Sequence, residues 1–347
     1  MNERFQKALK RQPVNAPPIW MMRQAGRYHS HYQNMKKTHS FSQLCLSPRL
    51  AAEVALGPIQ DFDFDLAILF SDILFPLMAV GVDLIFEEFG GPKLQTPMSL
   101  STLQKAPPTD RALEQLLFQK EAMIETRKIL PANKSLIGFV GGPWTLFTFA
   151  TQGTHKNGIR EAKALAPTLW SGFSEIMVPL LIENIRLQVE GGAEVVMILD
   201  TAAGDLAFEE LNEKVIKPLQ VLAASYPGKL GYYAKGLSSE GISLVQRQVP
   251  GLVGQGVDHR LPVREQVLKA PGFVQGNFDP ELLLLPPPQF TKALELWWKS
   301  LGFQNSGELS GWVCGLGHGI LPTTPESNVR DFVQKLRQWS QELPHGS

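Results

Sequence analysis

Two arginines stand four residues apart in the segment WMMRQAGRYHSHY, which spans residues 20–32. Arg23 and Arg27 are separated in part by the small residues Ala25 and Gly26, at which the chain can turn. A guanidinium group binds a carboxylate through two parallel hydrogen bonds, which the ammonium group of lysine does less well. The pair therefore indicates a site for a ligand with several carboxylates. The alternative is a surface helix carrying both arginines, but like charges at this spacing repel each other.

An aspartate directly follows an apolar run in the segment ILFSDIL, residues 68–74. Asp72 is expected to be partly buried, and a buried carboxylate needs a cation or an N–H group as its partner. The other interpretation is that Asp72 caps the N-terminus of the helix that follows.

Two glycine-rich segments could bring backbone or a histidine close to a ligand. In GFVGGPWTLF, residues 138–147, the glycines permit close approach of the backbone, although a tight turn between strand and helix explains them equally well. In GLGHGILP, residues 315–322, His318 stands between two glycines in an open turn, which is a poor place for core packing. An ordinary turn histidine remains the alternative.

Composition and missing motifs argue against several classes of protein. Lys and Arg (33) balance Asp and Glu (33), so we expect no nucleic-acid partner, which would need a basic excess or a basic stripe. The dinucleotide-binding, phosphate-binding and nucleophile-elbow motifs are missing. Two cysteines, Cys45 and Cys314, exclude a disulfide framework and a multi-cysteine zinc site, and Cys314 with His318 supplies only two ligands. We therefore expect no metal.

Eight short apolar runs alternate with longer segments of helical spacing. The chain of 347 residues, 44% hydrophobic and 19% charged, is long enough for two ordinary domains or one large barrel. We interpret the runs as strands at residues 19–22, 66–70, 136–140, 195–199, 230–233, 252–256, 273–276 and 312–315. Alternation of strands and helices predicts a parallel sheet, and eight repeats predict a single α/β domain over residues 1–347, a (β/α)8 TIM-type barrel. A short tail from about residue 343 is expected to be disordered.

Helices are expected at residues 174–190, 209–225 and 280–300, among others. The last helix is the clearest, with Thr324 as its N-cap and Pro325 at its first position. Its apolar face would consist of Val329, Phe332, Val333, Leu336 and Trp339. The LLLLPPP run at 282–288 predicts a helix end followed by a rigid loop.

Polar residues or tight turns follow each predicted strand. They are Arg23, Asp72, the turn at residues 141–143, Asp200 with Thr201, Lys235, Asp258, Asn277 and His318. The carboxyl ends of parallel barrel strands open onto one face, where active sites of this architecture lie. Any one of these residues can be an ordinary turn or cap residue. Arginine, aspartate and histidine on one rim together indicate a site.

The sequence contains no evident membrane segment. The N-terminus, MNERFQKALKRQPV, lacks the apolar core of a signal peptide. The most apolar long stretch, residues 73–86, is interrupted by Pro76, Gly81 and Asp83 and falls short of a membrane span. We expect a cytoplasmic protein without membrane contact.

These segments resemble the uroporphyrinogen decarboxylase family over nearly the whole chain. The matching segments are PIWMMRQAGRY (18–28), ILFSDIL (68–74), GFVGGPWTL (138–146), DTAAGDL (200–206), VQGNFDP (274–280) and GLGHGILPTTPESNV (315–329). The first and the last are specific together, because RQAGRY and LGHGI each recur rarely outside this family.

The resemblance implies a (β/α)8 barrel, typically a homodimer, that converts uroporphyrinogen III to coproporphyrinogen III. It removes four acetate carboxyl groups without a metal or an organic cofactor. Asp72 would be the essential aspartate, which accepts pyrrole N–H groups and stabilises a cationic intermediate. Arg23 and Arg27 would hold substrate carboxylates and are candidates for delivering protons. The full substrate-binding set implied is Arg23, Gln24, Ala25, Gly26, Arg27, Asp72, Phe149, Thr201 and His318, with Thr201 and His318 on peripheral carboxylates.

The sequence departs from the family pattern at Phe149, where a tyrosine usually stands, and at residues 312–314. Loss of the hydroxyl would affect turnover more than fold. Either the hydroxyl only tunes orientation around Asp72, or Thr148, Thr151 and Gln152 nearby replace it. Two alternatives remain. One is a weakly active or non-catalytic tetrapyrrole-binding relative. The other is a methyltransferase of corrinoid metabolism on the same scaffold, which would need a His/Cys zinc cluster.

Overall fold

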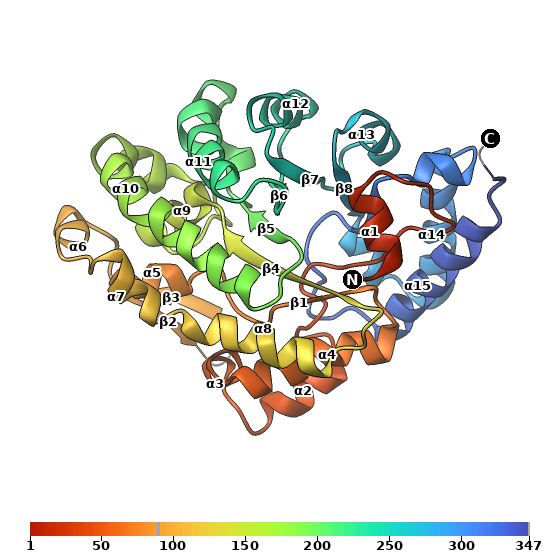
Figure 1. Cartoon of the computed structure of the whole chain (residues 1–347), viewed down its shortest axis with the longest axis horizontal. Coiled ribbons are helices and arrows are strands. Elements are labelled where there is room, and N and C mark those ends of the chain that lie inside the picture. The colour runs from red at the N-terminus through yellow and green to blue at the C-terminus, as the bar shows by residue number, and fades with distance from the viewer. Residues whose placement is uncertain (88–90, 346–347) are drawn as a thin grey trace.

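Seven parallel strands form a curled sheet in the computed structural model, which describes residues 1–87 and 91–345 (Figure 1). The strands are short and mostly apolar, as expected where both faces of a parallel sheet are covered. In sheet order they are β1 (Leu66–Ile68), β4 (Ser135–Gly141), β5 (Val196–Leu199), β6 (Leu230–Tyr233), β7 (Leu252–Gly256), β8 (Phe273–Phe278) and β9 (Trp312–Leu316). The predicted α/β fold with a parallel sheet is confirmed.

Helices cover the outer side of the sheet and alternate with the strands along the chain (Figure 1). They are α1 (Glu3–Leu9), α2 (Ser30–Lys36), α3 (Phe41–Leu46), α4 (Pro48–Phe62), α5 (Phe75–Ala79), α6 (Leu100–Gln104), α7 (Thr109–Glu114), α8 (Leu117–Ile129), α9 (Pro143–Gln152), α10 (Arg160–Glu190), α11 (Lys217–Ser225), α12 (Ser239–Gln248), α13 (Val263–Lys269), α14 (Pro287–Leu301) and α15 (Glu326–Gln341). The helices predicted at 174–190, 209–225 and 280–300 correspond to α10, α11 and α14.

Alternate strand residues fill two separate cores. On β5, Met197 belongs to a cluster on the inner side of the sheet, whereas Val196 and Ile198 belong to the larger cluster beneath the helices. Phe5 of α1 packs into the inner cluster with its ring centroid 6.0 Å from that of Phe273, the first residue of β8. Helix α1 therefore closes the amino-terminal end of the sheet's interior.

Helix α10 is, within the described ranges, the one helix long and apolar enough to cross a membrane. Almost half of its most apolar window is buried inside the protein, and α10 packs against α7, α8, α9 and α11. This packing accounts for its apolar composition, because a helix covered by several neighbours is apolar on more than one face.

Residues 18–20 lie between the two edge strands of the sheet. Toward β9, the Trp20 N–H donates to Cys314 O at 3.0 Å and the Cys314 N–H donates to Pro18 O at 2.8 Å. Toward β1, the Asp65 N–H donates to Ile19 O at 3.0 Å. The strand predicted at residues 19–22 is reduced to a single parallel bridge between Ile19 and Cys314. Proline at position 18 lacks an N–H, and a turn at Arg23 ends the extended chain.

Several helix starts differ from the prediction, since α10 begins at Arg160 and α11 at Lys217 where residues 174 and 209 were expected. The chain re-enters a helix at Pro287 instead of continuing as a rigid loop, since proline fits the first turn of a helix. Helix α15 begins at Glu326 with Pro325 at the N-cap, so Thr324 is not the cap and the predicted start was one residue early.

An antiparallel hairpin, β2 (Leu84–Glu87) with β3 (Gly91–Leu94), was not predicted. At the C-terminus, the Ser306 N–H donates to Pro344 O at 2.9 Å. The end of the predicted disordered tail, residues 346–347, lies outside the described residues.

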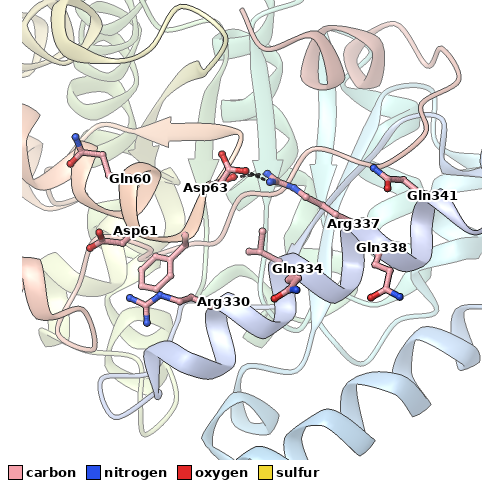
Figure 2. Close-up of a pocket in the computed structure, with 10 residues that line it drawn as sticks. Gln60, Asp61, Asp63, Arg330, Gln334, Arg337, Gln338 and Gln341 are labelled. Carbon is pink, nitrogen blue, oxygen red and sulfur yellow. Dashed lines mark hydrogen bonds and ion pairs between the residues drawn. The ribbon is translucent and has the colours of Figure 1, made fainter.

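Asp65 holds residues 18–20 in place. Its buried carboxylate accepts hydrogen bonds from the Ile19 N–H at 2.9 Å, Asn2 Nδ2 at 3.2 Å and Arg4 Nη1 at 3.0 Å. Arg337 of α15 also approaches Asp65, at 3.4 Å, and pairs with Asp63. Figure 2 shows Asp63 facing Arg337 in a polar pocket between α4 and α15. The pocket lies before the start of β1, whereas Asp72 follows its end.

Replacing Asp65 with alanine should lower the free energy of unfolding by about 3–5 kcal/mol, because a buried charge and several donors lose their partner. Denaturant titration measures this loss. Glu121→Ala, at an exposed position on α8, is the control and should change stability by less than about 0.5 kcal/mol. Equal effects of the two substitutions would mean that backbone hydrogen bonds alone hold residues 18–20.

Candidate active site

Arg23 stands on a tight turn. The Gln24 N–H donates to Met21 O at 3.1 Å, and Arg23 has φ 61°, in the left-handed region. A Cβ atom at position 26 would lie 2.9 Å from the carbonyl oxygen of Arg23, so the turn requires Gly26. The surface-helix alternative for Arg23 and Arg27 is therefore wrong, and both side chains are exposed.

The turn offers backbone donors to a ligand. Among the described residues, nothing accepts a hydrogen bond from the N–H groups of Ala25, Gly26 or Arg27, and successive free N–H groups bind anions. Gln24 differs, because it is buried and its Nε2 donates to Leu66 O at 2.8 Å. Its side chain therefore anchors the turn to β1.

Asp72 follows β1 and is half-buried. Its Oδ1 accepts the Leu74 N–H at 2.9 Å, the one hydrogen bond that the described residues give to this carboxylate. Helix α5 has Leu74 as its N-cap residue, so Asp72 is not the cap. Burial raises the pKa of Asp72, while the Leu74 N–H and the Arg23 charge oppose this rise. One carboxylate oxygen therefore remains free beside a cation.

Arg23 also reaches the segment after β9. A Cβ atom at position 319 would lie 2.5 Å from Arg23 Cδ, so the side chain packs directly on Gly319. Although part of Arg23 is exposed, burial lowers its pKa, which the Asp72 charge raises and the Arg27 charge lowers. A side chain that is exposed to water and also packs closely against the protein is typical of a concave surface. The structure thus brings Arg23, Asp72 and His318 to the same rim.

His318 is neutral at physiological pH. Burial lowers its pKa to about 3, and the charges of Arg23 and Lys235 act in the same direction. Its Nδ1 lies 3.1 Å from the Tyr233 hydroxyl, whose proton is donated to Gly317 O at 2.7 Å. The Tyr233 oxygen is then left to accept from Nδ1–H, which fixes the tautomer with Nε2 as a free acceptor.

Three polar residues at strand ends are fully engaged by the protein. Asp200 accepts the Thr145 N–H at 2.9 Å and the Thr145 hydroxyl at 2.7 Å, and burial raises its pKa to about 6. Asp258 pairs with Arg260, and Asn277 donates to Asp258 O at 2.9 Å. These residues join adjacent strand ends, which favours their interpretation as ordinary turn residues.

Thr201 and Phe149 meet at a histidine that the sequence analysis missed. The Thr201 hydroxyl lies 3.1 Å from His155 Nε2, and the half-buried Phe149 ring packs edge-to-face on the His155 ring with centroids 5.8 Å apart. Neither residue type nor spacing distinguishes His155 in the segment FATQGTHKNG, because no predicted strand end lies next to it in the sequence.

Lys36 is a second residue that the sequence analysis missed. Its Nζ is buried, and no described residue accepts a hydrogen bond from it. The pKa of Cys45 is raised by burial and by the charge of Asp72, and lowered by the charge of Lys36, so both charges lie near that thiol. In the sequence Lys36 precedes Lys37 and resembles half of an ordinary surface pair. Its burial becomes evident only in the folded structure, where α2 packs against α4.

Comparison with known proteins decides the family. The family model described as uroporphyrinogen decarboxylase (URO-D) matches residues 1–339. The chain belongs to the uroporphyrinogen decarboxylase family. It is 34% identical to the uroporphyrinogen decarboxylase of Chloroflexus aggregans, over 98% of this chain and 96% of that protein. It is 35% identical to that of Anaeromyxobacter dehalogenans, over 97% and 98% of the two chains. The predicted resemblance, and with it a decarboxylase of tetrapyrrole biosynthesis, is confirmed.

A solved methyltransferase from Methanosarcina mazei has a similar structure, with a TM-score of 0.72 over 97% of this chain and 98% of that one. At 18% identity this likeness shows the fold alone. Within residues 1–87 and 91–345, no group of three or more His, Cys, Asp or Glu side chains could hold a metal ion. Cys45 and Cys314 are buried, free and raised in pKa, so neither is a ready thiolate ligand.

Replacing Lys36 with methionine should stabilise the fold and weaken the enzyme. The free energy of unfolding should rise by about 1–3 kcal/mol, because an unpartnered buried charge becomes apolar. On the hypothesis that this unpartnered ammonium pairs with a substrate carboxylate, kcat/KM for uroporphyrinogen should at the same time fall about tenfold or more. The control is Lys37→Met, since Lys37 is exposed and bonds only to Asn34. Unchanged kinetics for Lys36→Met would make Lys36 a purely structural residue.

Proposed function

We propose that this chain removes the four acetate carboxyl groups of uroporphyrinogen III to form coproporphyrinogen III, without a cofactor. The observation that carries this proposal is Asp72, a half-buried carboxylate with one engaged oxygen, in the field of Arg23. Around it stand cations and free N–H groups suited to a polycarboxylate. A single negative charge amid several carboxylate-binding groups fits a ligand that is anionic at its edge and becomes cationic at its centre.

The chemistry explains why a carboxylate is needed. Protonation of a pyrrole ring carbon makes the ring a cation that accepts the electron pair of the breaking carbon–carboxylate bond. Carbon dioxide leaves, protonation of the resulting methylene yields a methyl group, and the ring carbon then releases the proton that it had gained, which restores the neutral pyrrole. Each acetate therefore consumes one proton and releases one carbon dioxide, with no net oxidation or reduction.

Asp72 would stabilise this cation while it accepts pyrrole N–H groups. At about 4 Å and an effective dielectric constant of about 20, such a pair is worth roughly 4 kcal/mol. If this interaction develops only in the transition state, it accelerates the reaction about a thousandfold. Arg23 would hold a substrate carboxylate and keep the neighbouring Asp72 ionised. We assign no proton transfer to Arg23, because a guanidinium remains protonated in proteins.

The remaining groups of the site would bind the peripheral carboxylates. Arg27 is exposed and cationic, and the free N–H groups of Ala25 and Gly26 lie beside it. Thr201, predicted for the same role, has its hydroxyl 3.1 Å from His155 Nε2 and would contribute through that histidine. His318 would act differently, since its free Nε2 is an acceptor in the resting state. A carboxylate binds there together with a proton, carried either by the imidazole or by the carboxyl group.

We also infer that residues 19–22 complete a closed (β/α)8 barrel in place of an eighth strand. Their hydrogen bonds to both β9 and β1 support this closure. The homodimer and the cytoplasmic location, without membrane or nucleic-acid partners, remain predictions from the resemblance and from composition. Size-exclusion chromatography with light scattering tests the dimer.

Asp72→Asn should nearly abolish turnover and leave the fold intact, because the amide keeps the shape but loses the charge facing the cation. The assay is anaerobic conversion of uroporphyrinogen, with products separated by carboxyl number, and the expected loss is about a thousandfold. Activity within about threefold of the wild type would remove Asp72 from the mechanism. A wild type that binds the substrate but forms no coproporphyrinogen would favour the non-catalytic relative.

Strong chelators should leave activity unchanged, because the described residues offer no cluster of metal ligands. The measurement is turnover after prolonged chelation, with elemental analysis of the same sample. Activity that chelation removes and zinc restores would favour the methyltransferase-like alternative.

A further inference from the structure

The loop between α9 and α10 carries His155, a histidine to which the proposed function gives no role of its own. Three polar side chains of α9 lie near Phe149 in the sequence, but each is engaged by backbone. The Thr148 hydroxyl donates to Trp144 O at 2.9 Å and the Thr151 hydroxyl to Phe147 O at 2.8 Å, within the helix. These contacts do not favour the alternative in which the three residues replace a hydroxyl at Phe149.

Gln152 serves the loop itself. Its Nε2 donates to Thr154 O at 2.6 Å and to Gly158 O at 2.8 Å, and its Oε1 accepts the Ala162 N–H at 3.0 Å. The loop begins at Gly153, which has φ 75° and no room for a side chain beside Leu94. These constraints hold residues 153–158 in a defined conformation, and with them the side chain of His155.

His155 bridges the loop and the end of β5. Its Nε2 lies 3.1 Å from Thr201 Oγ1, and its ring packs edge-to-face against the Phe149 ring with centroids 5.8 Å apart. No described residue hydrogen-bonds to Nδ1. When the Thr201 hydroxyl donates to Nε2, the neutral imidazole carries its proton on Nδ1, which becomes a free donor.

The charges around His155 favour an anionic ligand. Burial lowers the pKa of His155 first of all, and Lys235, Arg23 and Lys156 lower it further, whereas Asp205 raises it. His318 lies within the same field, since the His155 charge also lowers its pKa. Three cations and the carboxylate of Asp205 therefore act on His155, and a carboxylate placed between the two histidines lies in the field of Arg23 and Lys235.

We propose that His155 is a substrate-positioning residue whose free ring nitrogen binds a peripheral carboxylate of the tetrapyrrole, held in orientation by Thr201 and Phe149. It supplies the hydrogen-bonding group that the phenyl ring of Phe149 cannot supply. This inference rests on the proposed function for the identity of the ligand. Other residues are proposed to contact the reacting ring, so His155 affects the binding and alignment of the substrate.

The test compares His155→Phe, which keeps an aromatic ring on Phe149, with His155→Asn, whose amide nitrogen can take the place of Nδ1. A hydrogen bond to a charged group predicts a KM for uroporphyrinogen at least tenfold higher in His155→Phe, with kcat within about threefold. His155→Asn should restore KM to within about threefold of the wild type. Thr201→Val should raise KM less, and add little to His155→Phe, because the two residues act as one unit. His345→Phe, at an exposed position, is the control.

Binding of uroporphyrin, followed by quenching of tryptophan fluorescence, gives a readout that does not need turnover. A Kd at least tenfold weaker in His155→Phe supports the role of His155 even if the wild type proves inactive, in which case only the proposed reaction fails. Unchanged KM and Kd in His155→Phe, with thermal unfolding like that of the wild type, would overturn the inference. Equal weakening in His155→Phe and His155→Asn would also overturn it, because the loop and not the ring nitrogen would then be responsible.

Discussion

The buried carboxylate of Asp65 fixes the relation between the first and last strands, and the site depends on that relation. Asp65 accepts the Ile19 N–H with its side chain and donates its own N–H to Ile19 O, while the far side of the same segment bonds to Cys314 of β9. A few residues later the chain turns, and Gln24 ties this turn to β1. The guanidinium of Arg23 consequently stands between the exit of β1, with Asp72, and the exit of β9, with His318 and Gly319. If residues 18–20 were hydrogen-bonded to only one edge strand, their distance from the other edge strand would not be fixed.

The electrostatic balance of the rim is incomplete without a ligand. Arg23, Arg27 and Lys235 carry positive charge, Lys36 has a buried ammonium group without a hydrogen-bond partner, and Asp72 is the one carboxylate that faces Arg23 within the part of the chain that the structure describes. Such a surplus destabilises the folded chain by mutual repulsion, and it adds to burial, the main cause, in lowering the pKa values of His155 and His318. A polycarboxylate relieves both effects when it binds. Stability is thereby traded for affinity, as is common where a site is organised before its ligand arrives.

Sequence patterns identified most strands and the family, because short apolar runs and the segments RQAGRY and LGHGI are local features. Local patterns failed where a tertiary contact decides the structure. Residues 19–22 are apolar enough for a strand, yet the turn at Arg23 and the proline at 18 leave one bridge. Pro287 and its neighbours favour a loop or a helix start equally, and the packing of α14 decides for the helix. His155 has no local signal at all. Its role follows from a loop shaped by Gln152 and Gly153 and from Thr201, which is distant in the sequence.

The aspartates at the strand ends show why residue type and position alone do not define a catalytic group. Asp72, Asp200 and Asp258 each follow a strand, and burial acts to raise the pKa of all three. Asp200 is surrounded by donors from Thr145 and Tyr232, and Asp258 by Arg260 and the Gly236 N–H. Each of those carboxylates has its lone pairs committed to joining neighbouring strands. Asp72 accepts a hydrogen bond from one backbone N–H and lies in the electrostatic field of one arginine. These interactions hold its carboxylate in place but leave part of its hydrogen-bonding capacity unused. Unsatisfied hydrogen-bonding capacity, and not burial or charge, distinguishes Asp72, for which we propose binding of pyrrole N–H groups, from the aspartates that hold the sheet together.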